Sequence, residues 1–128
     1  MNYLLDTHVL IWWIAGKVKL SAAVQKTLSE ATGTVLVSVA SLWEMALKIK
    51  LGKLKMPDPF DAYILRQIQI NRMELLPIHA PHVLETMNLP PHHRDPFDRL
   101  LVAQARKEEL ILITGDEMLR AYDVQILW

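Results

Sequence analysis

The apolar run Thr34-Val35-Leu36-Val37-Ser38 leads directly into the helical pattern Val39–Lys50. A short run that is apolar without alternation is typical of a strand buried on both faces of a sheet. The residues that follow are amphipathic, with Ser41, Glu44 and Lys48 forming a polar stripe at spacings of three and four. Together the two patterns predict a strand of a parallel sheet followed by a covering helix.

The same alternation repeats along the chain. Further apolar runs predict strands at Tyr3–Leu5, Glu74–Ile78, Ile111–Thr114 and Val124–Leu127. Helical patterns lie between the strands, at His8–Ala15, Ser21–Ala31, Asp61–Arg72, Pro81–Met87 and Phe97–Glu109. This order favours an α/β fold, a three-layer α/β/α sandwich with a mainly parallel sheet. The two Pro-rich connections, 52–59 and 89–96, are too short to separate domains, so we expect residues 1–128 to form a single domain.

Composition limits the class of protein. Of 128 residues, 52% are hydrophobic, above the roughly 45–50% of a typical domain, which leaves apolar surface for a partner. The formal charge is zero, whereas a general nucleic-acid footprint would be more basic, so local features must hold any nucleic acid. The absence of cysteine excludes disulfides and thiolate metal sites. No apolar run approaches the roughly 20 residues of a membrane span, and the start lacks a basic signal-peptide region. We therefore expect a cytoplasmic protein without membrane contact.

Four acidic residues stand at or just beyond the carboxyl ends of the apolar runs, or open a helix: Asp6, Glu44, Asp98 and Asp116. In a parallel sheet the carboxyl ends of neighbouring strands meet at one edge, so we expect the four carboxylates to converge. Four like charges in one place repel, and either protonation or a cation relieves the repulsion. Oxygen ligands suit Mg²⁺ or Mn²⁺ rather than Zn²⁺. Two such ions about 3.5–4 Å apart are a common device for attack on a phosphodiester.

Polar neighbours extend this predicted site. Four hydroxyl residues flank the acids and are candidates to hydrogen-bond the carboxylates or metal-bound water: Thr7, Ser38, Ser41 and Thr114. Candidates for contact with RNA are His92, His93, Arg94 and Arg99. A solvated loop explains His92-His93-Arg94 equally well.

Structural roles also explain each acid taken alone. Asp6 and Asp116 are each suited to cap a following helix, and Asp95-Pro96-Phe97-Asp98 has the order of a cap, a first-position proline and an early acid. Glu44 and Lys48 form a favourable helical pair worth about 0.2–0.5 kcal/mol. Both interpretations stay open for the individual residues, and the joint pattern favours the site.

Four sequence blocks carry a family resemblance: Leu4-Leu5-Asp6-Thr7-His8, Ser38-Val39-Ala40-Ser41-Leu42-Trp43-Glu44, His92-His93-Arg94-Asp95-Pro96-Phe97-Asp98-Arg99-Leu100-Leu101 and Thr114-Gly115-Asp116. In this order they resemble the signature blocks of PIN-domain ribonucleases, and most closely those of the toxins of VapBC-type toxin–antitoxin pairs. The resemblance implies a Mg²⁺- or Mn²⁺-dependent endoribonuclease whose metal-binding catalytic acids are Asp6, Glu44, Asp98 and Asp116. It also implies a homodimer that a small antitoxin protein neutralises.

Other functions remain as alternatives. A non-catalytic module on the same fold would bind nucleic acid or protein, and the loss of an acid would favour it. A phosphatase would use Asp6 as a nucleophile, but such enzymes usually carry a second acid two residues later, where this chain has His8. A flap-type DNA nuclease is a third.

The expected antitoxin groove involves the helix Val39–Lys50 and the segment Met56–Ile68, with Phe60 and Ile64 as candidate anchors. Burial of both anchors in the core is the alternative.

Overall fold

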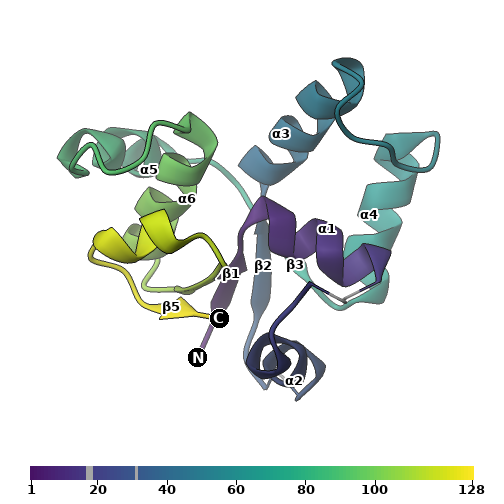
Figure 1. Ribbon diagram of the computed structural model, residues 1–128, viewed down its shortest axis with the longest axis horizontal. Helices are drawn as coiled ribbons and strands as arrows, with labels where there is room; N and C mark the ends of the chain where they lie inside the picture. Colours follow the sequence, from purple (N-terminus) through teal and green to yellow (C-terminus); the bar gives the residue numbers. More distant parts are fainter. Residues whose placement is uncertain (17–18, 31) are drawn as a thin grey trace.

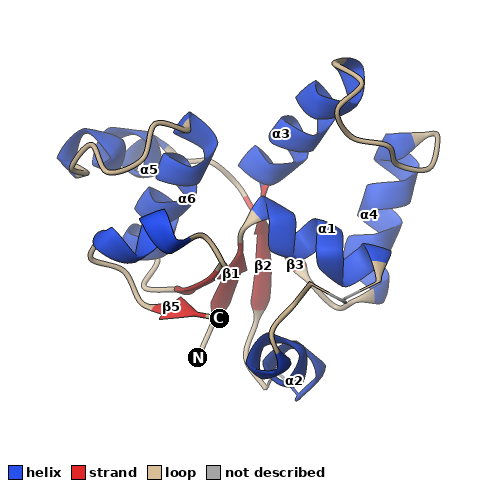
Figure 2. Cartoon of the chain, viewed as in Figure 1, coloured by secondary structure: helices blue, strands red, loops and turns tan. Residues whose placement is uncertain are grey.

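The structure is a computed structural model that describes residues 1–16, 19–30 and 32–128. Its strands are β1 (Tyr3–Leu5), β2 (Val35–Ser38), β3 (Glu74–Leu76), β4 (Ile111–Ile113) and β5 (Ile126–Leu127). Its helices are α1 (Thr7–Ala15), α2 (Ala22–Glu30), α3 (Val39–Lys50), α4 (Phe60–Ile70), α5 (Ala80–Glu85) and α6 (Pro96–Lys107), with the 3₁₀ turns η1 (Thr86–Asn88) and η2 (Glu117–Ala121) (Figure 2). Ala31, the predicted last residue of the second helix, lies outside the described residues. Within the described residues, no helix has the length and apolar character needed to cross a bilayer.

The five strands form one sheet in the order β3-β2-β1-β4-β5, and every pair is parallel. The predicted parallel sheet is therefore confirmed. β1 lies at the centre, where Leu5 is level with Val37 of β2 and Ile113 of β4. The next residue of each strand is thus level as well, which brings Asp6, Ser38 and Thr114 to one edge of the sheet.

Alternate strand residues enter two separate cores. Leu5, Val37 and Ile113 pack with residues of α1, α2, α3 and α4, whereas Leu4 and Leu112 pack with α6 and η2 on the other face. Figure 1 shows the sheet between these two groups of helices. The expected three-layer sandwich is confirmed, and its two-sided burial explains why the strands are apolar without alternation.

The edge strand β3 differs from the prediction. Glu74 is exposed and Leu75 is 38% exposed, so this strand is not buried on both faces. It also ends at Leu76, before Pro77, because proline has no N–H to offer the ladder. The chain then passes to α5, which packs against α6.

Candidate metal centre

Asp6 lies at the centre of the carboxyl edge. It follows β1 directly and caps α1, with Oδ1 accepting a hydrogen bond from the Val9 N–H at 3.0 Å. Its Oδ2 accepts from the Thr114 hydroxyl on the neighbouring strand. The side chain is 4% exposed, and this burial raises the pKa of the Asp6 carboxyl. Two strands and one helix therefore fix both oxygens of one carboxylate.

Asp116 is placed by the loop that leaves β4. Its backbone N–H donates to Thr114 Oγ at 3.1 Å, and its Oδ1 caps η2 by accepting from the Met118 N–H at 2.9 Å. Thr114 thus joins two of the acids, because it donates to Asp6 and accepts from Asp116. The role predicted for this threonine beside the carboxylates agrees with these contacts.

Asp98 enters from the first turn of α6. Asp95 caps this helix with Oδ1, and Pro96 takes the first helical position, as the sequence predicts. Burial is the largest of the effects that raise the pKa of Asp98 to about 7, and the nearby charges of Asp95, Asp6 and Glu44 add to it. Asp98 therefore titrates near neutrality unless a cation compensates the acids around it.

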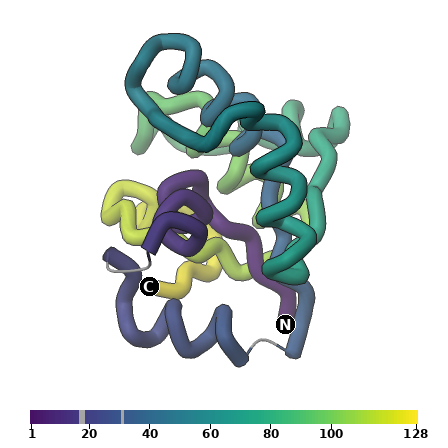
Figure 3. The backbone as a smooth tube through the Cα atoms, turned by 90° about the vertical axis from the view of Figure 1, so that its right-hand side faces the viewer, coloured from purple at the N-terminus to yellow at the C-terminus, as the bar shows by residue number. Residues whose placement is uncertain are grey.

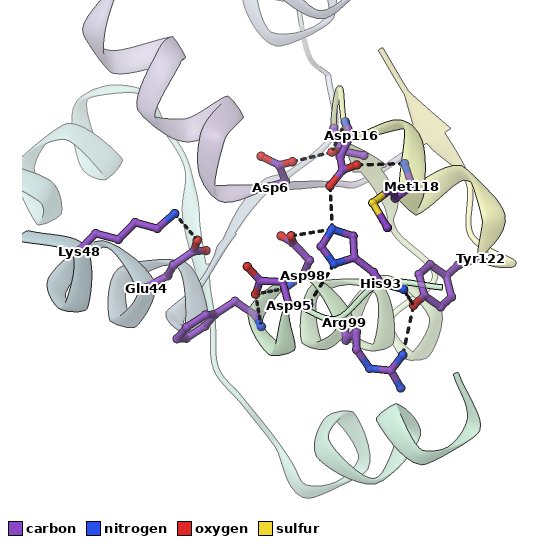
Figure 4. Close-up of polar contacts among 12 residues, drawn as sticks. Asp6, Glu44, Lys48, His93, Asp95, Asp98, Arg99, Asp116, Met118 and Tyr122 are labelled. Atoms are coloured by element: carbon purple, nitrogen blue, oxygen red, sulfur yellow. Dashed lines mark hydrogen bonds and ion pairs between the residues drawn. The ribbon is translucent and has the colours of Figure 1, made fainter. Parts of the chain in front are cut away.

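His93 lies inside the acidic cluster. Its Nε2 is 2.9 Å from Asp116 Oδ2 and 3.4 Å from Asp98 Oδ2 (Figure 4). Its Nδ1 accepts a hydrogen bond from the Asp95 N–H at 3.0 Å. A backbone N–H can only donate, so Nδ1 carries no proton and the hydrogen of the neutral ring is on Nε2. His93 is thus a fixed donor aimed at two carboxylates.

Glu44 borders the cluster on α3. It is 3% exposed, and its Oε2 pairs with Lys48 Nζ at 2.8 Å. Its other oxygen, Oε1, is buried without a hydrogen-bond partner among the described residues. Figure 4 shows Asp6, Asp98 and Asp116 facing a common space, with Glu44 to its side beside Lys48. The structure therefore brings three predicted acids together and places the fourth next to them.

These residues fit a hard divalent cation. Ligand atoms of His93, Asp98 and Asp116 lie within 4.8 Å of one another, and the unpartnered Glu44 oxygen is one that an oxygen-seeking ion would satisfy. Ligation by His93 Nε2 would require moving its proton to Nδ1, which faces the Asp95 N–H. The carboxylates are therefore the ligands that the geometry favours, and His93 is a hydrogen-bond partner of those ligands.

The remaining hydroxyl candidates have other partners. Thr7 donates to the Ser41 hydroxyl at 2.9 Å, and Ser38 caps α3 by accepting from the Ala40 N–H. The described hydrogen bonds of these three side chains include none to an acid of the cluster. Their prediction rested on nearness in sequence, whereas capping and a hydroxyl pair use the same groups locally.

Arg99, a predicted RNA contact, is bound to other parts of the protein. Its guanidinium donates to the Thr86, Leu89 and Pro90 carbonyls and to the Tyr122 hydroxyl, at 2.9–3.2 Å. Arginine commits its fork of N–H groups to these acceptors, so it ties the 86–90 segment to α6. His92 and Arg94 remain exposed candidates, and the ring of His92 meets the edge of Tyr122.

Two features of the site are not evident from the sequence. The ring of His93, a predicted RNA contact, faces the acids, because its Nδ1 accepts a hydrogen bond from the Asp95 N–H. Tyr122 accepts from both the His93 N–H and Arg99, and no local motif marks it. These partners lie 29 and 23 residues from Tyr122 in the sequence, so no local pattern reveals the contacts.

The contacts of Asp6 bear on the phosphatase alternative. Each Asp6 oxygen accepts one hydrogen bond and keeps a second lone pair, so these contacts are compatible with metal ligation and do not by themselves exclude a nucleophile. The cap interpretations of Asp6 and Asp116 hold as well, and they coexist with the cluster. In Asp116, for example, Oδ1 caps η2 while Oδ2 meets His93.

Comparison with known proteins places the chain. The PIN domain family matches residues 3–125, and no curated protein shows significant similarity in sequence. A chain of the DNA-bound VapBC from Salmonella typhimurium has a TM-score of 0.73 at 17% identity, with 99% of this chain and 97% of that chain covered. A chain of VapBC2 from Rickettsia felis, bound to a promoter DNA fragment, has a TM-score of 0.71 at 16% identity, with 99% and 98% covered. A chain of VapBC-5 from Mycobacterium tuberculosis has a TM-score of 0.63 at 20% identity, with 98% of this chain and 97% of that chain covered.

The family match spans all four sequence blocks and the three strands β1, β2 and β4 that lead to the acidic cluster. The predicted resemblance is thereby confirmed at the level of the family, and the similar solved structures share the fold over nearly the whole chain. This chain belongs to the PIN domain family.

Proposed function

We propose that this chain is a Mg²⁺- or Mn²⁺-dependent endoribonuclease that acts as the toxin of a toxin–antitoxin pair in the cytoplasm. The observation that carries the proposal is the convergence of Asp6, Asp98 and Asp116, with Glu44 beside them, at the carboxyl edge of a PIN-domain sheet. A buried group of acids is unstable without protons or cations, and the substrate of a nuclease brings further negative charge. A divalent ion resolves both.

Each residue of the chain has a role in this scheme. Asp6, Glu44, Asp98 and Asp116 would hold the ion, which when bound activates water and offsets charge on the phosphate. Thr114 keeps Asp6 oriented, since its hydroxyl spans β4 and β1. His93 keeps Asp116 in place by donating to Oδ2. No described residue of the cluster needs to act as a strong base.

The antitoxin partner is supported by the similar solved structures, which are VapBC toxin–antitoxin complexes. An exposed apolar stripe runs along α3 and its C-cap residue at a spacing of four residues: Val39, Trp43, Leu47 and Leu51. We assign this stripe to the antitoxin, because Trp43 precedes Glu44 and packs edge-on against Phe97 beside the acids. A basic antitoxin side chain docked here would be close enough to compete with the metal.

The predicted anchors need correction. Ile64 is 1% exposed and belongs to the core, and Phe60 is half-buried against the same core. The open side of α4 carries Leu65, which is 51% exposed. Phe60→Asp should therefore impair folding, whereas Leu47→Asp should abolish antitoxin binding in a pull-down with the folded chain. If the wild type is a dimer by light scattering and Leu47→Asp is a monomer that still binds the antitoxin, the stripe belongs to the contact with a second copy.

The experiment for the enzymatic activity is incubation of the purified chain with total RNA, followed by mapping of the new ends. We expect cleavage with Mg²⁺ or Mn²⁺, none with EDTA, and none with Asp98→Asn. Asp123→Asn is the matched control, because Asp123 is an exposed acid outside the cluster. Cleavage that persists in EDTA or in Asp98→Asn contradicts the proposal, and intact RNA under every condition favours a binding module.

A further inference from the structure

A pocket of about 300 Å³ lies beside the acidic cluster and shares two of its residues. Its lining consists of Asp6, His8, Trp12, Gly115 and Asp116. The volume is at the lower end of the roughly 300–1,000 Å³ typical of ligand sites. One part of the lining is therefore acidic and belongs to the candidate metal centre, and another part is aromatic.

The aromatic part is a consequence of two successive tryptophans on α1. Trp13 points into the core, is 8% exposed, and donates Nε1–H to Asn71 Oδ1. Neighbouring residues of a helix project about 100° apart, so Trp12 cannot follow it inward. Trp12 is half-buried, and its ring lies 5.8 Å from that of His8, one turn earlier.

Trp128, from the other end of the chain, packs against Trp12 without being part of the pocket lining. Its ring centroid is 6.1 Å from that of Trp12, which agrees with the proximity of α1 and the C-terminal segment in Figure 3. A Cβ on Gly115 would come within 2.9 Å of the Trp128 indole, so only glycine admits this packing without displacement. Gly115 precedes Asp116, so the absence of a side chain there lets the tryptophan pair lie beside this acid.

A positively charged side chain, Lys19, lies beside Trp12. Lys19 Nζ lies 5.7 Å from the centroid of the Trp12 ring. The chain has no net charge, so attraction of a polyanion depends on such local charges. The acids repel RNA unless a metal ion is bound, whereas the lysine beside Trp12 attracts the phosphates of RNA.

We propose that this pocket binds one nucleobase of single-stranded RNA, next to the phosphodiester bond that is cleaved, with Trp12 as the stacking platform. The inference rests on the proposed function and adds a specificity determinant to it. Single-stranded RNA is recognised through unstacked bases that lie on aromatic side chains. A base in this pocket would leave its own phosphate beside Asp6 and Asp116, which line the same cavity.

The test is a double-mutant cycle in which one change is made in the protein and the other in the RNA. After the cleavage site is mapped, short single-stranded RNAs are made with an abasic nucleotide at each position around it. We expect one abasic position beside the cleaved bond to lower kcat/KM of the wild type by roughly 5- to 150-fold, the range for stacking of one base. Trp12→Leu should lower kcat/KM on intact RNA by a similar factor, and Trp12→Phe should retain most of it.

The combination of the two changes decides the matter. If the base stacks on Trp12, the abasic RNA should hardly lower kcat/KM of Trp12→Leu any further, because both changes remove the same contact. If the two changes lower kcat/KM by factors that multiply, the base does not stack on Trp12 and the proposal is wrong. The proposal is also wrong if Trp12→Leu cleaves intact RNA with the kcat/KM of the wild type. A poorly folded variant also gives losses that multiply, so the circular dichroism and melting temperature of Trp12→Leu must first match those of the wild type. A wild-type chain that cleaves no RNA contradicts both the proposed function and the base-binding pocket. RNA cleavage in which the losses of kcat/KM multiply contradicts the base-binding pocket alone.

Discussion

His93 Nε2 donates to Asp116 Oδ2 at 2.9 Å while its Nδ1 accepts from the Asp95 N–H, so the ring is a neutral donor. We predict that His93→Ala weakens Mn²⁺ binding by about 10- to 100-fold, the usual effect of removing a partner that orients a metal ligand. Isothermal titration calorimetry measures the affinity. His92→Ala is the matched control, because the neighbouring histidine is exposed.

A spectroscopic result separates a donor from a ligand. Pulsed electron paramagnetic resonance of bound Mn²⁺ should show no directly coordinated nitrogen, because the ligands are carboxylates. The ¹⁵N shifts of His93 should show the proton on Nε2. A strong nitrogen coupling that disappears in His93→Ala would mean that the histidine itself ligates the ion.

The second prediction concerns stability without metal. Asp98 has a pKa of about 7 in the folded chain and an ordinary value of 3.8, so the folded state binds an extra proton between these values. The free energy of unfolding should therefore fall as the pH rises from about 4 to about 7. Burial raises the pKa of Asp6 too, which adds a loss of the same sign.

Urea unfolding in EDTA at pH 5 and pH 7.5 checks this effect. Asp98→Asn removes the titrating group, so it should flatten the pH dependence and be roughly 2–4 kcal/mol more stable than the wild type at pH 7.5. Asp123→Asn should retain the wild-type slope. An Asp98→Asn chain that is less stable than the wild type at pH 7.5 would mean that its carboxylate is compensated within the protein.

The sequence was enough to predict the sheet and the positions of the acids at its edge. Apolar runs and capping residues are local signals, and β1 and α3 have the predicted bounds. Hydrogen bonds between residues that are far apart in the sequence leave no local pattern, so they could not be predicted. Arg99 has the sequence context of a site residue, yet the carbonyls of residues 86–90 bind it. His93 turns inward because a backbone N–H two residues later is free to meet its ring.

The third prediction uses Glu44, whose Oε1 is buried without a described partner. Millimolar Mn²⁺ should raise the melting temperature of the wild type, because an ion that binds only the folded state shifts unfolding by mass action. Glu44→Gln should reduce this rise. Lys48→Met is the control, since it removes the ion pair but leaves the carboxylate for the metal. An equal rise in wild type and Glu44→Gln would exclude Glu44 from the metal site.

The last prediction separates two arginines that the sequence alone treats alike. Arg99 donates to three carbonyls and to Tyr122, so Arg99→Lys should cost about 2 kcal/mol of unfolding free energy, since lysine cannot reproduce the fork. Arg94 is exposed, and Arg94→Ala should leave urea unfolding unchanged. It should instead weaken binding of single-stranded RNA and lower the slope of log affinity against log salt by about 0.7, the share of one phosphate contact. An unchanged salt slope would remove Arg94 from the RNA-binding surface, and an Arg99→Lys chain as stable as the wild type would show that its four hydrogen bonds are dispensable.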